Sequence, residues 1–421
     1  PYTGDWSIRG TGLTCRFPDG TVFTGDYTSV PGRAPRVKVE ADRTKTRPGA
    51  GIAVEFPLPA SASSTRPAAA SGRPVAVSAR DVQAMFRAGN YAAAKAHLQD
   101  LLKHLPQSSY VWYNLACAQS RVGELDDAVA SLESAVGRGF LSFDYMQRDP
   151  DLEPLRDHPG FRSLLSRRDE LQRQAADRML AALRRQYGND CLLDISHEDK
   201  VIFATSVSRP KLVQLKAFLS DYAKAQWKHL FTHKLDRYVT VIIPKPDQLR
   251  SAKYLGFYSR WSRTLVARNI DPTVRHEFTH ALHYADQEAL AQNHPTWIVE
   301  GLATLFEYSR VVKGQAQPSA ASRWTVFRKG LLRQHLPLDR LTRLGRAEFL
   351  RQASVTYPQS YYVMLYLHQR KALKSWYDAY TAAYAKDPTG LSAMEKVLGS
   401  KAEDIQTDWV KWLGANPRPA R

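Results

Sequence analysis

The sequence predicts a multidomain protein: a short N-terminal β-hairpin repeat, then an all-α helical repeat, then an α+β domain in the C-terminal half. Three observations lead to this prediction. Similar residues recur with a period of 21 near the N-terminus, others recur with a period of 34 after residue 80, and β-branched runs alternate with amphipathic segments after residue 200. At 421 residues the chain is long enough for two to four domains.

The composition is typical of a globular protein with a basic surface. Hydrophobic residues make up 43% and charged residues 24%, and no apolar run is long enough to predict a transmembrane segment. Lys and Arg number 59 against 41 Asp and Glu, a formal charge of +18, but the charges are dispersed, so we expect a solvated basic surface and no specific nucleic-acid partner. The widely spaced Cys15, Cys117 and Cys191 predict neither a disulfide framework nor a cysteine zinc site.

The sequence leaves the compartment open. It begins at Pro1, without a methionine or a recognisable signal peptide. We expect that an N-terminal piece is missing from it. A secreted or periplasmic protein whose export signal is absent from this chain fits that expectation.

Residues 1–28 contain the first repeat. Tyr2-Thr-Gly-Asp-Trp6 returns as Phe23-Thr-Gly-Asp-Tyr27, with Asp19-Gly20 between them, which predicts strands joined by glycine-containing turns. These residues resemble the MORN repeat, a short β-hairpin unit; an unrelated glycine-rich hairpin is the alternative. Residues 29–78 are rich in Pro, Ala, Ser, Arg and Gly and predict a flexible basic linker.

Residues 79–187 contain the second repeat. Small and large apolar residues recur 34 apart at the packing positions of a helix-turn-helix unit: Gly89 and Gly123, Ala94 and Ala128, Leu98 and Leu132, Pro106 and Phe140. The set resembles the tetratricopeptide repeat, and the segment from Asp149 to Leu165 resembles the capping helix that ends such an array. The resemblance implies either a protein partner bound by the helices or packing against the rest of the chain.

Residues 188–416 predict the α+β domain. An amphipathic helix is expected at Pro210–Leu230, and strands are expected at Lys200–Val207, Tyr238–Ile243, Thr264–Ala267 and near Phe257. A small twisted sheet therefore precedes the helix with the chemistry-bearing motif.

That motif is His276-Glu277-Phe278-Thr279-His280. Residues four apart share a helix face, so both histidines can present a nitrogen to one Zn²⁺, while Glu277 lies beside them. Glu300 lies on a second, otherwise apolar helix, where an ionised carboxylate is costly to bury without a cation. Two histidines and one glutamate leave the fourth zinc position open, as catalysis requires.

At this point the chain resembles the gluzincin zinc peptidases, and among them the peptidase MA-like family. The resemblance lies in three runs of residues: HEFTHAL at 276–282, PTWIVEGLATLFE at 295–307 and YPQSYYVMLYL at 357–367. It implies a zincin-like domain, Zn²⁺ as cofactor, a peptide or protein as substrate and Glu277 as general base. It also implies that Gly256–Tyr258 belongs to an edge strand that holds extended substrate.

The donor to the oxyanion is open at this stage. The resemblance points to Tyr361 or Tyr357, with His294 behind them, and we expect Tyr361 ahead of Tyr357; packing in the core is the alternative for both. The position one turn after Glu300, acidic in well-known gluzincins, is Thr304. Glu307 is the next acidic residue, and we expect it on the surface rather than beside a metal-binding histidine.

Two other functions remain open. The first is a catalytically silent scaffold that binds partners through its repeats. The second is a zinc amidase that hydrolyses cell-wall material, to which a cationic surface would be attracted. Retention of Glu277 beside all three expected metal ligands favours an active enzyme over the scaffold.

Overall fold

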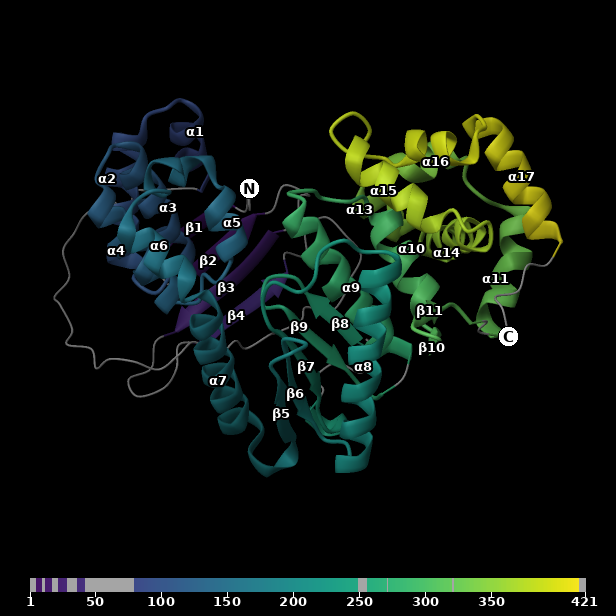
Figure 1. Cartoon of the computed structure of the whole chain (residues 1–421), viewed down its shortest axis with the longest axis horizontal. Helices are drawn as coiled ribbons and strands as arrows, with labels where there is room; N and C mark the ends of the chain where they lie inside the picture. Colours follow the sequence, from purple (N-terminus) through teal and green to yellow (C-terminus); the bar gives the residue numbers. More distant parts are fainter. Residues whose placement is uncertain are drawn as a thin grey trace. The chain divides into compact units, whose positions relative to one another are not determined.

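The chain divides into two compact units, Pro1–Ala182 and Leu183–Arg421. The computed structural model describes residues 5–9, 12–16, 22–28, 36–41, 79–248, 256–270, 272–319 and 322–415, with side chains from residue 81 onward except 322–325 (Figure 1). None of the described helices is long and apolar enough to cross a membrane. The boundary between the units falls inside helix α7, Arg168–Tyr187, rather than after it.

The first unit begins with a four-stranded antiparallel sheet of order β1-β2-β3-β4, formed by Asp5–Arg9, Gly12–Arg16, Val22–Thr28 and Arg36–Ala41. Strands are therefore present where the hairpin repeat was predicted, and the MORN resemblance itself stays a prediction. The predicted linker is wrong at Arg36–Ala41, because this segment pairs with β3. Its Val-Lys-Val-Glu alternation has the period of a strand. Residues 42–78 lie outside the described part.

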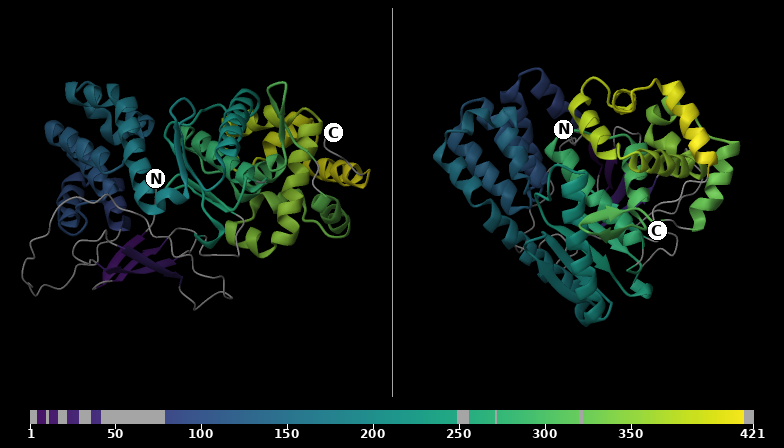
Figure 2. Two further views of the ribbon diagram at one scale, coloured as in Figure 1. Left: turned by 90° about the horizontal axis from the view of Figure 1, so that it is seen from below. Right: turned by 45° about the vertical axis from the view of Figure 1, so that its right-hand side comes forward.

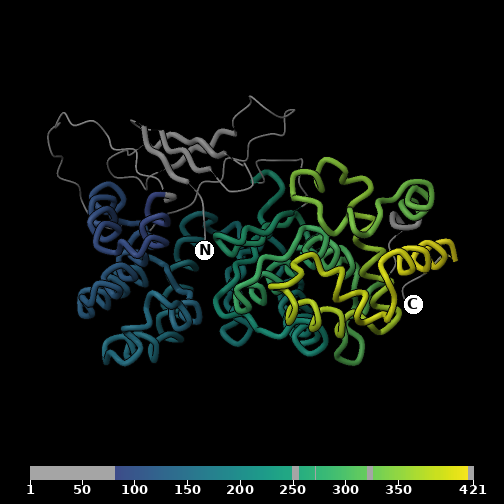
Figure 3. Tube along the Cα trace, turned by 90° about the horizontal axis from the view of Figure 1, so that it is seen from above, coloured from purple at the N-terminus to yellow at the C-terminus, as the bar shows by residue number. Residues whose placement is uncertain are grey.

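The helical repeat follows as two helix pairs that stack along the chain (Figure 3). The alanines and leucines that recur 34 apart are fully buried, as predicted, and Gly89 and Gly123 take positive φ at the turns within the pairs. Asn90 caps the second helix by accepting a hydrogen bond from the Ala93 amide. The four helices are α1 (Ala79–Arg87), α2 (Tyr91–His104), α3 (Ser109–Arg121) and α4 (Leu125–Gly137).

The predicted capping helix is instead two short elements. After α5 (Phe143–Arg148), a 3-10 helix η1 spans Pro150–Leu155 and α6 spans Pro159–Ser166. The break arises at His158, whose extended backbone is what a residue before proline favours. Both elements still bury their apolar residues against α3 and α4, so the segment covers the end of the repeat as a cap would.

The second unit begins with a five-stranded mixed sheet of order β5-β6-β7-β9-β8. Strands β6, β7 and β9 are parallel to one another, and β5 and β8 are antiparallel edge strands. The predicted strands are confirmed and β5 was missed. The strands are β5 (Leu192–Ser196), β6 (Val201–Thr205), β7 (Val239–Ile243), β8 (Gly256–Ser259) and β9 (Thr264–Ala267).

Helices α8 (Arg209–His229) and α9 (Pro272–Ala289) pack with this sheet in one apolar core. Phe203, Val241, Leu219 and Phe278 are among its fully buried members. A short hairpin and a group of helices complete the unit (Figure 2). They are α10 (Thr296–Phe306), β10 (Arg310–Val312), β11 (Gln315–Gln317), α11 (Ser322–Arg333), α12 (Leu338–Arg343), α13 (Arg346–Arg351), α14 (Ala353–Gln369), α15 (Leu373–Ala383), α16 (Leu391–Leu398) and α17 (Ala402–Gly414).

Candidate functional site

Helices α9 and α10 bring the three expected metal ligands together. His276 and His280 lie one turn apart on α9 with their Nε2 atoms 3.2 Å apart, and Glu300 reaches them from α10, with its Oε2 3.6 Å from each Nε2. All three side chains are largely buried. This cluster is the group of metal-ligating side chains found among the described residues.

The spacing of these atoms fits a zinc ion. Ligand atoms about 2.0–2.1 Å from a tetrahedral zinc lie about 3.3–3.4 Å from one another. The three separations of 3.2, 3.6 and 3.6 Å bracket that value. The donor set is also one that zinc prefers, two imidazoles and a carboxylate, with room in the tetrahedron for one further ligand.

The charges at the cluster indicate a place for a cation. Burial alone would lower the pKa of His276, but its polar contact with Glu300 and the charges of Glu277, Glu300 and Glu307 outweigh it and raise the pKa to about 9. Burial raises the pKa of Glu300, and the neighbouring His280 and His276 outweigh it and hold the pKa far below its usual range. The carboxylates around His276 therefore favour positive charge at this position, as they would favour a bound cation.

Glu277 lies beside the ligands and is 8% exposed. Burial raises the pKa of its carboxyl, which the charges of His276 and His280 partly oppose. A backbone hydrogen bond from Tyr258 also reaches it, so the expected general base contacts edge strand β8. Gly256 allows this approach, since a Cβ at that position would lie 2.6 Å from the Thr273 methyl group.

Of the two expected tyrosines, Tyr357 lies near Glu300 and Tyr361 lies in the core. Tyr357 is half-buried, and after burial the charge of Glu300 and a hydrogen bond with it are what raise its pKa. Tyr361 is 1% exposed and packs edge-on against Tyr362 in the core. Both lie on α14, which approaches α10 closely at Gly301. Tyr357 is therefore the nearer of these two tyrosines to the cluster.

The expectation that Glu307 is a surface residue is wrong. Its side chain is buried, and one carboxylate oxygen lies 3.9 Å from Nδ1 of His276, the ring nitrogen that does not face the cluster. The backbone carbonyl of Glu307 accepts a hydrogen bond from Arg275 Nε at 2.8 Å, which anchors the end of α10 to α9. Thr304 donates its hydroxyl hydrogen to the Glu300 carbonyl instead.

One residue near the cluster was missed by the sequence-based prediction. Tyr284 follows His280 by one turn, and its pKa is raised by burial and then by the charge of Glu300. The i, i+4 spacing on α9 was the signal that could have found it. The sequence predicts His283 as an ordinary polar or core histidine, and the structure agrees: its Nε2 lies 2.8 Å from Nδ1 of His294, and this buried pair joins α9 to the loop before α10. His294 therefore has a structural role and does not belong to the cluster.

A group of paired charges ties the β8–β9 turn to the end of α9. Arg263 donates hydrogen bonds to Glu288 at 2.9 Å and to Asp236 at 3.0 Å, and Arg260 and Arg237 also donate to Glu288. Burial would raise the pKa of Asp236, but Arg263 and Arg237 outweigh it and lower the pKa. Arg263 has a φ of 50°, a strained value for a residue with a side chain, which these pairs stabilise.

The comparisons with known proteins bear on the first unit. The tetratricopeptide repeat family matches residues 85–140, which confirms that part of the prediction. The chain is also similar to a chloroplastic protein of Arabidopsis thaliana, with 33% identity over 85 residues. That match covers 20% of this chain and spans 25% of the length of the Arabidopsis protein. No solved structure matches the chain significantly. A tetratricopeptide repeat followed by a mixed α+β region is therefore established.

Proposed function

We propose that the second unit is a zincin-like zinc peptidase of the gluzincin type, in which His276, His280 and Glu300 hold Zn²⁺ and Glu277 is the general base. The convergence of two imidazole nitrogens and one carboxylate oxygen beside a second buried carboxylate carries this proposal. Zinc content of the purified protein, and cleavage of an unfolded protein substrate before and after chelation, test it.

Each group at the site has a separate task in this reaction. Bound zinc would supply Lewis acidity to the scissile carbonyl and lower the pKa of a water molecule. Glu277 would take a proton at its carboxylate from the attacking water and return it to the leaving amine, for which a pKa raised by burial is suitable. The substrate lies extended along edge strand β8, whose Tyr258 amide touches Glu277.

Tyr357 is proposed as the donor to the oxyanion. Tyr357→Phe should lower kcat by about 10²–10³-fold, the usual cost of one oxyanion donor, and leave the zinc content unchanged. Tyr361→Phe is the matched control, because it removes the same hydroxyl one turn away on α14 from a residue packed in the core. Steady-state kinetics with one peptide substrate compare the two. A larger loss in Tyr361→Phe would reverse the assignment.

Glu307 is proposed to orient His276 through its Nδ1. Glu307→Gln should weaken zinc binding by about 10–100-fold, as the loss of a carboxylate behind a ligating histidine does. Competition with a fluorescent chelator measures the zinc dissociation constant without any need for activity. Glu403→Gln, an exposed glutamate on α17, is the control and should bind zinc as the wild type does. Equal affinities for both variants would remove Glu307 from this role.

The first unit supports an additional role in binding. Tetratricopeptide repeats commonly mediate contacts between proteins, and residues 85–140 match that family. We propose that these helices recruit a protein partner or substrate to the enzyme. A parallel activity screen with peptides and with cell-wall fragments separates a peptidase from the alternative zinc amidase, and absence of hydrolysis by zinc-loaded protein would favour the scaffold.

A further inference from the structure

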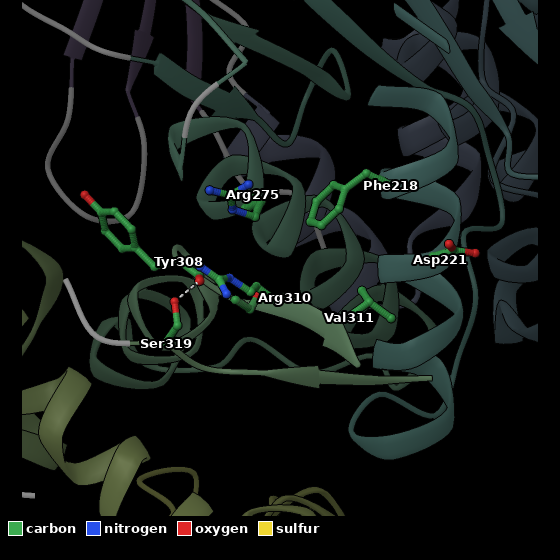
Figure 4. A pocket seen from close by; sticks show the side chains of 8 residues that line it. Phe218, Asp221, Arg275, Tyr308, Arg310, Val311 and Ser319 are labelled. Carbon is green, nitrogen blue, oxygen red and sulfur yellow. Dashed lines mark hydrogen bonds between the residues drawn. The ribbon is translucent and has the colours of Figure 1, made fainter. Parts of the chain in front are cut away.

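A cavity lies next to His276, at the preceding residue of α9, Arg275. It has a volume of about 550 Å³ and opens to solvent between α8, α9 and the segment that leads from α10 into β10 (Figure 4). Two arginines and one carboxylate are among its lining residues: Arg275, Arg310 and Asp221. None of the three belongs to the expected catalytic or metal-binding groups.

The cavity carries an excess of positive charge on one wall. Figure 4 shows the guanidinium groups of Arg275 and Arg310 on the same side, and Asp221 on the opposite side beyond Phe218 and Val311. Within the described part of the chain, Arg310 makes no ion pair or side-chain hydrogen bond. Two like charges that line one cavity repel each other, and a bound anion removes that repulsion.

Two contacts hold Arg275 in a fixed orientation. Its Nε donates to the Glu307 carbonyl at 2.8 Å, and its guanidinium carbon lies 5.5 Å from the centre of the Phe218 ring. A planar guanidinium fixed in this way loses little freedom when it binds the oxygens of a carboxylate or phosphate. The hydroxyl of Ser319 donates to the Tyr308 carbonyl and closes the neighbouring wall.

We propose that this cavity binds a small oxyanion, with Arg310 and Arg275 as the residues that contact its oxygens. The shared chemistry is that of a carboxylate or a phosphate group. Asp221 opposes binding of an anion by its charge and thereby limits affinity. The site is independent of the proposed zinc chemistry, because its lining residues need no metal to form it.

Thermal unfolding of metal-free protein tests the proposal. Inorganic phosphate and acetate are titrated separately against chloride at constant ionic strength. We expect a saturable rise in Tm of about 2–4 °C in the wild type at saturation. Arg310→Gln should lose most of that rise, and Asp221→Asn should reach half-saturation at a lower anion concentration. Arg333→Gln, an exposed arginine on α11 away from the cavity, should behave as the wild type and accounts for general salt effects.

Each result of this titration leads to a different conclusion about the ligand. A rise with phosphate alone identifies a phosphate group as the ligand, and a rise with both anions identifies oxyanions in general. A rise that is equal in the wild type and Arg310→Gln, or absent with both anions, overturns the proposal. Arg310→Lys retains the charge and should bind with intermediate affinity, which checks that loss in Arg310→Gln reflects the anion contact and not misfolding. Since no metal is present, the result does not depend on whether the protein is a peptidase.

Discussion

Glu300→Ala is expected to abolish zinc binding. Wild-type protein dialysed at neutral pH should retain one zinc per chain, and the variant should retain none. The physical reason is that Glu300 is the anionic ligand of the three and the one supplied by α10; without it only the two imidazoles of α9 remain to hold the ion. The affinity for zinc should fall by more than the factor of about 10–100 that is expected when a residue that contacts a metal ligand is replaced. Elemental analysis measures the zinc content directly.

The control for this variant is Glu403→Ala, which removes an exposed glutamate from the same unit. It should keep its zinc. Circular dichroism of both variants tests whether Glu300→Ala is folded, which we expect because alanine is the best helix former. If folded Glu300→Ala retained stoichiometric zinc, or if the wild type held none, the metal site would be incorrectly assigned and the scaffold function would be favoured.

Glu277→Gln is expected to lose activity while it keeps the metal. Removal of a general base lowers kcat by about 10²–10⁴-fold, because glutamine has the same shape but cannot accept the proton. Glu277 faces the ligands without being one of the three convergent donors, so the zinc content should equal that of the wild type. Measuring kcat, KM and zinc on one preparation separates these effects, and KM should change little.

Glu277→Asp completes this test. Aspartate can accept a proton but is one methylene shorter, so its kcat should fall between those of the wild type and Glu277→Gln. Full activity in Glu277→Gln would rule out the proposed base. Loss of zinc in Glu277→Gln would instead mean that the carboxylate supports the metal site, and its catalytic role would then have to be measured at saturating zinc.

Periodicity predicted the parts of the site that depend on local geometry. His276 and His280 share a face because they lie four apart on a helix, and Glu300 was recognised as a buried carboxylate on an apolar helix. The choice between Tyr357 and Tyr361 depends on the rotation of α14 about its axis, which packing at Gly301 determines. No local pattern contains that information.

The errors in the predicted fold also arise where the local sequence pattern does not contain the necessary information. Strand β5 is half-buried and contains Asp194, so it lacks the apolar run that identified the equally long β6 and β7. Glu307 follows the last residue of α10, a position usually exposed, and becomes buried because Arg275 draws its backbone against α9. Strand β4 was hidden in a segment whose overall composition is that of a linker.

The paired charges at the β8–β9 turn give the proposed substrate-binding edge a weaker dependence on salt than the basic surface has. Arg263 and Glu288 are 8% and 12% exposed at their side chains, so added salt screens their attraction weakly. The attraction of a surface of net charge +18 for acidic substrates, by contrast, acts through solvent and falls steeply with ionic strength. Salt therefore changes how fast a substrate arrives, while the alignment of β8 with Glu277 persists.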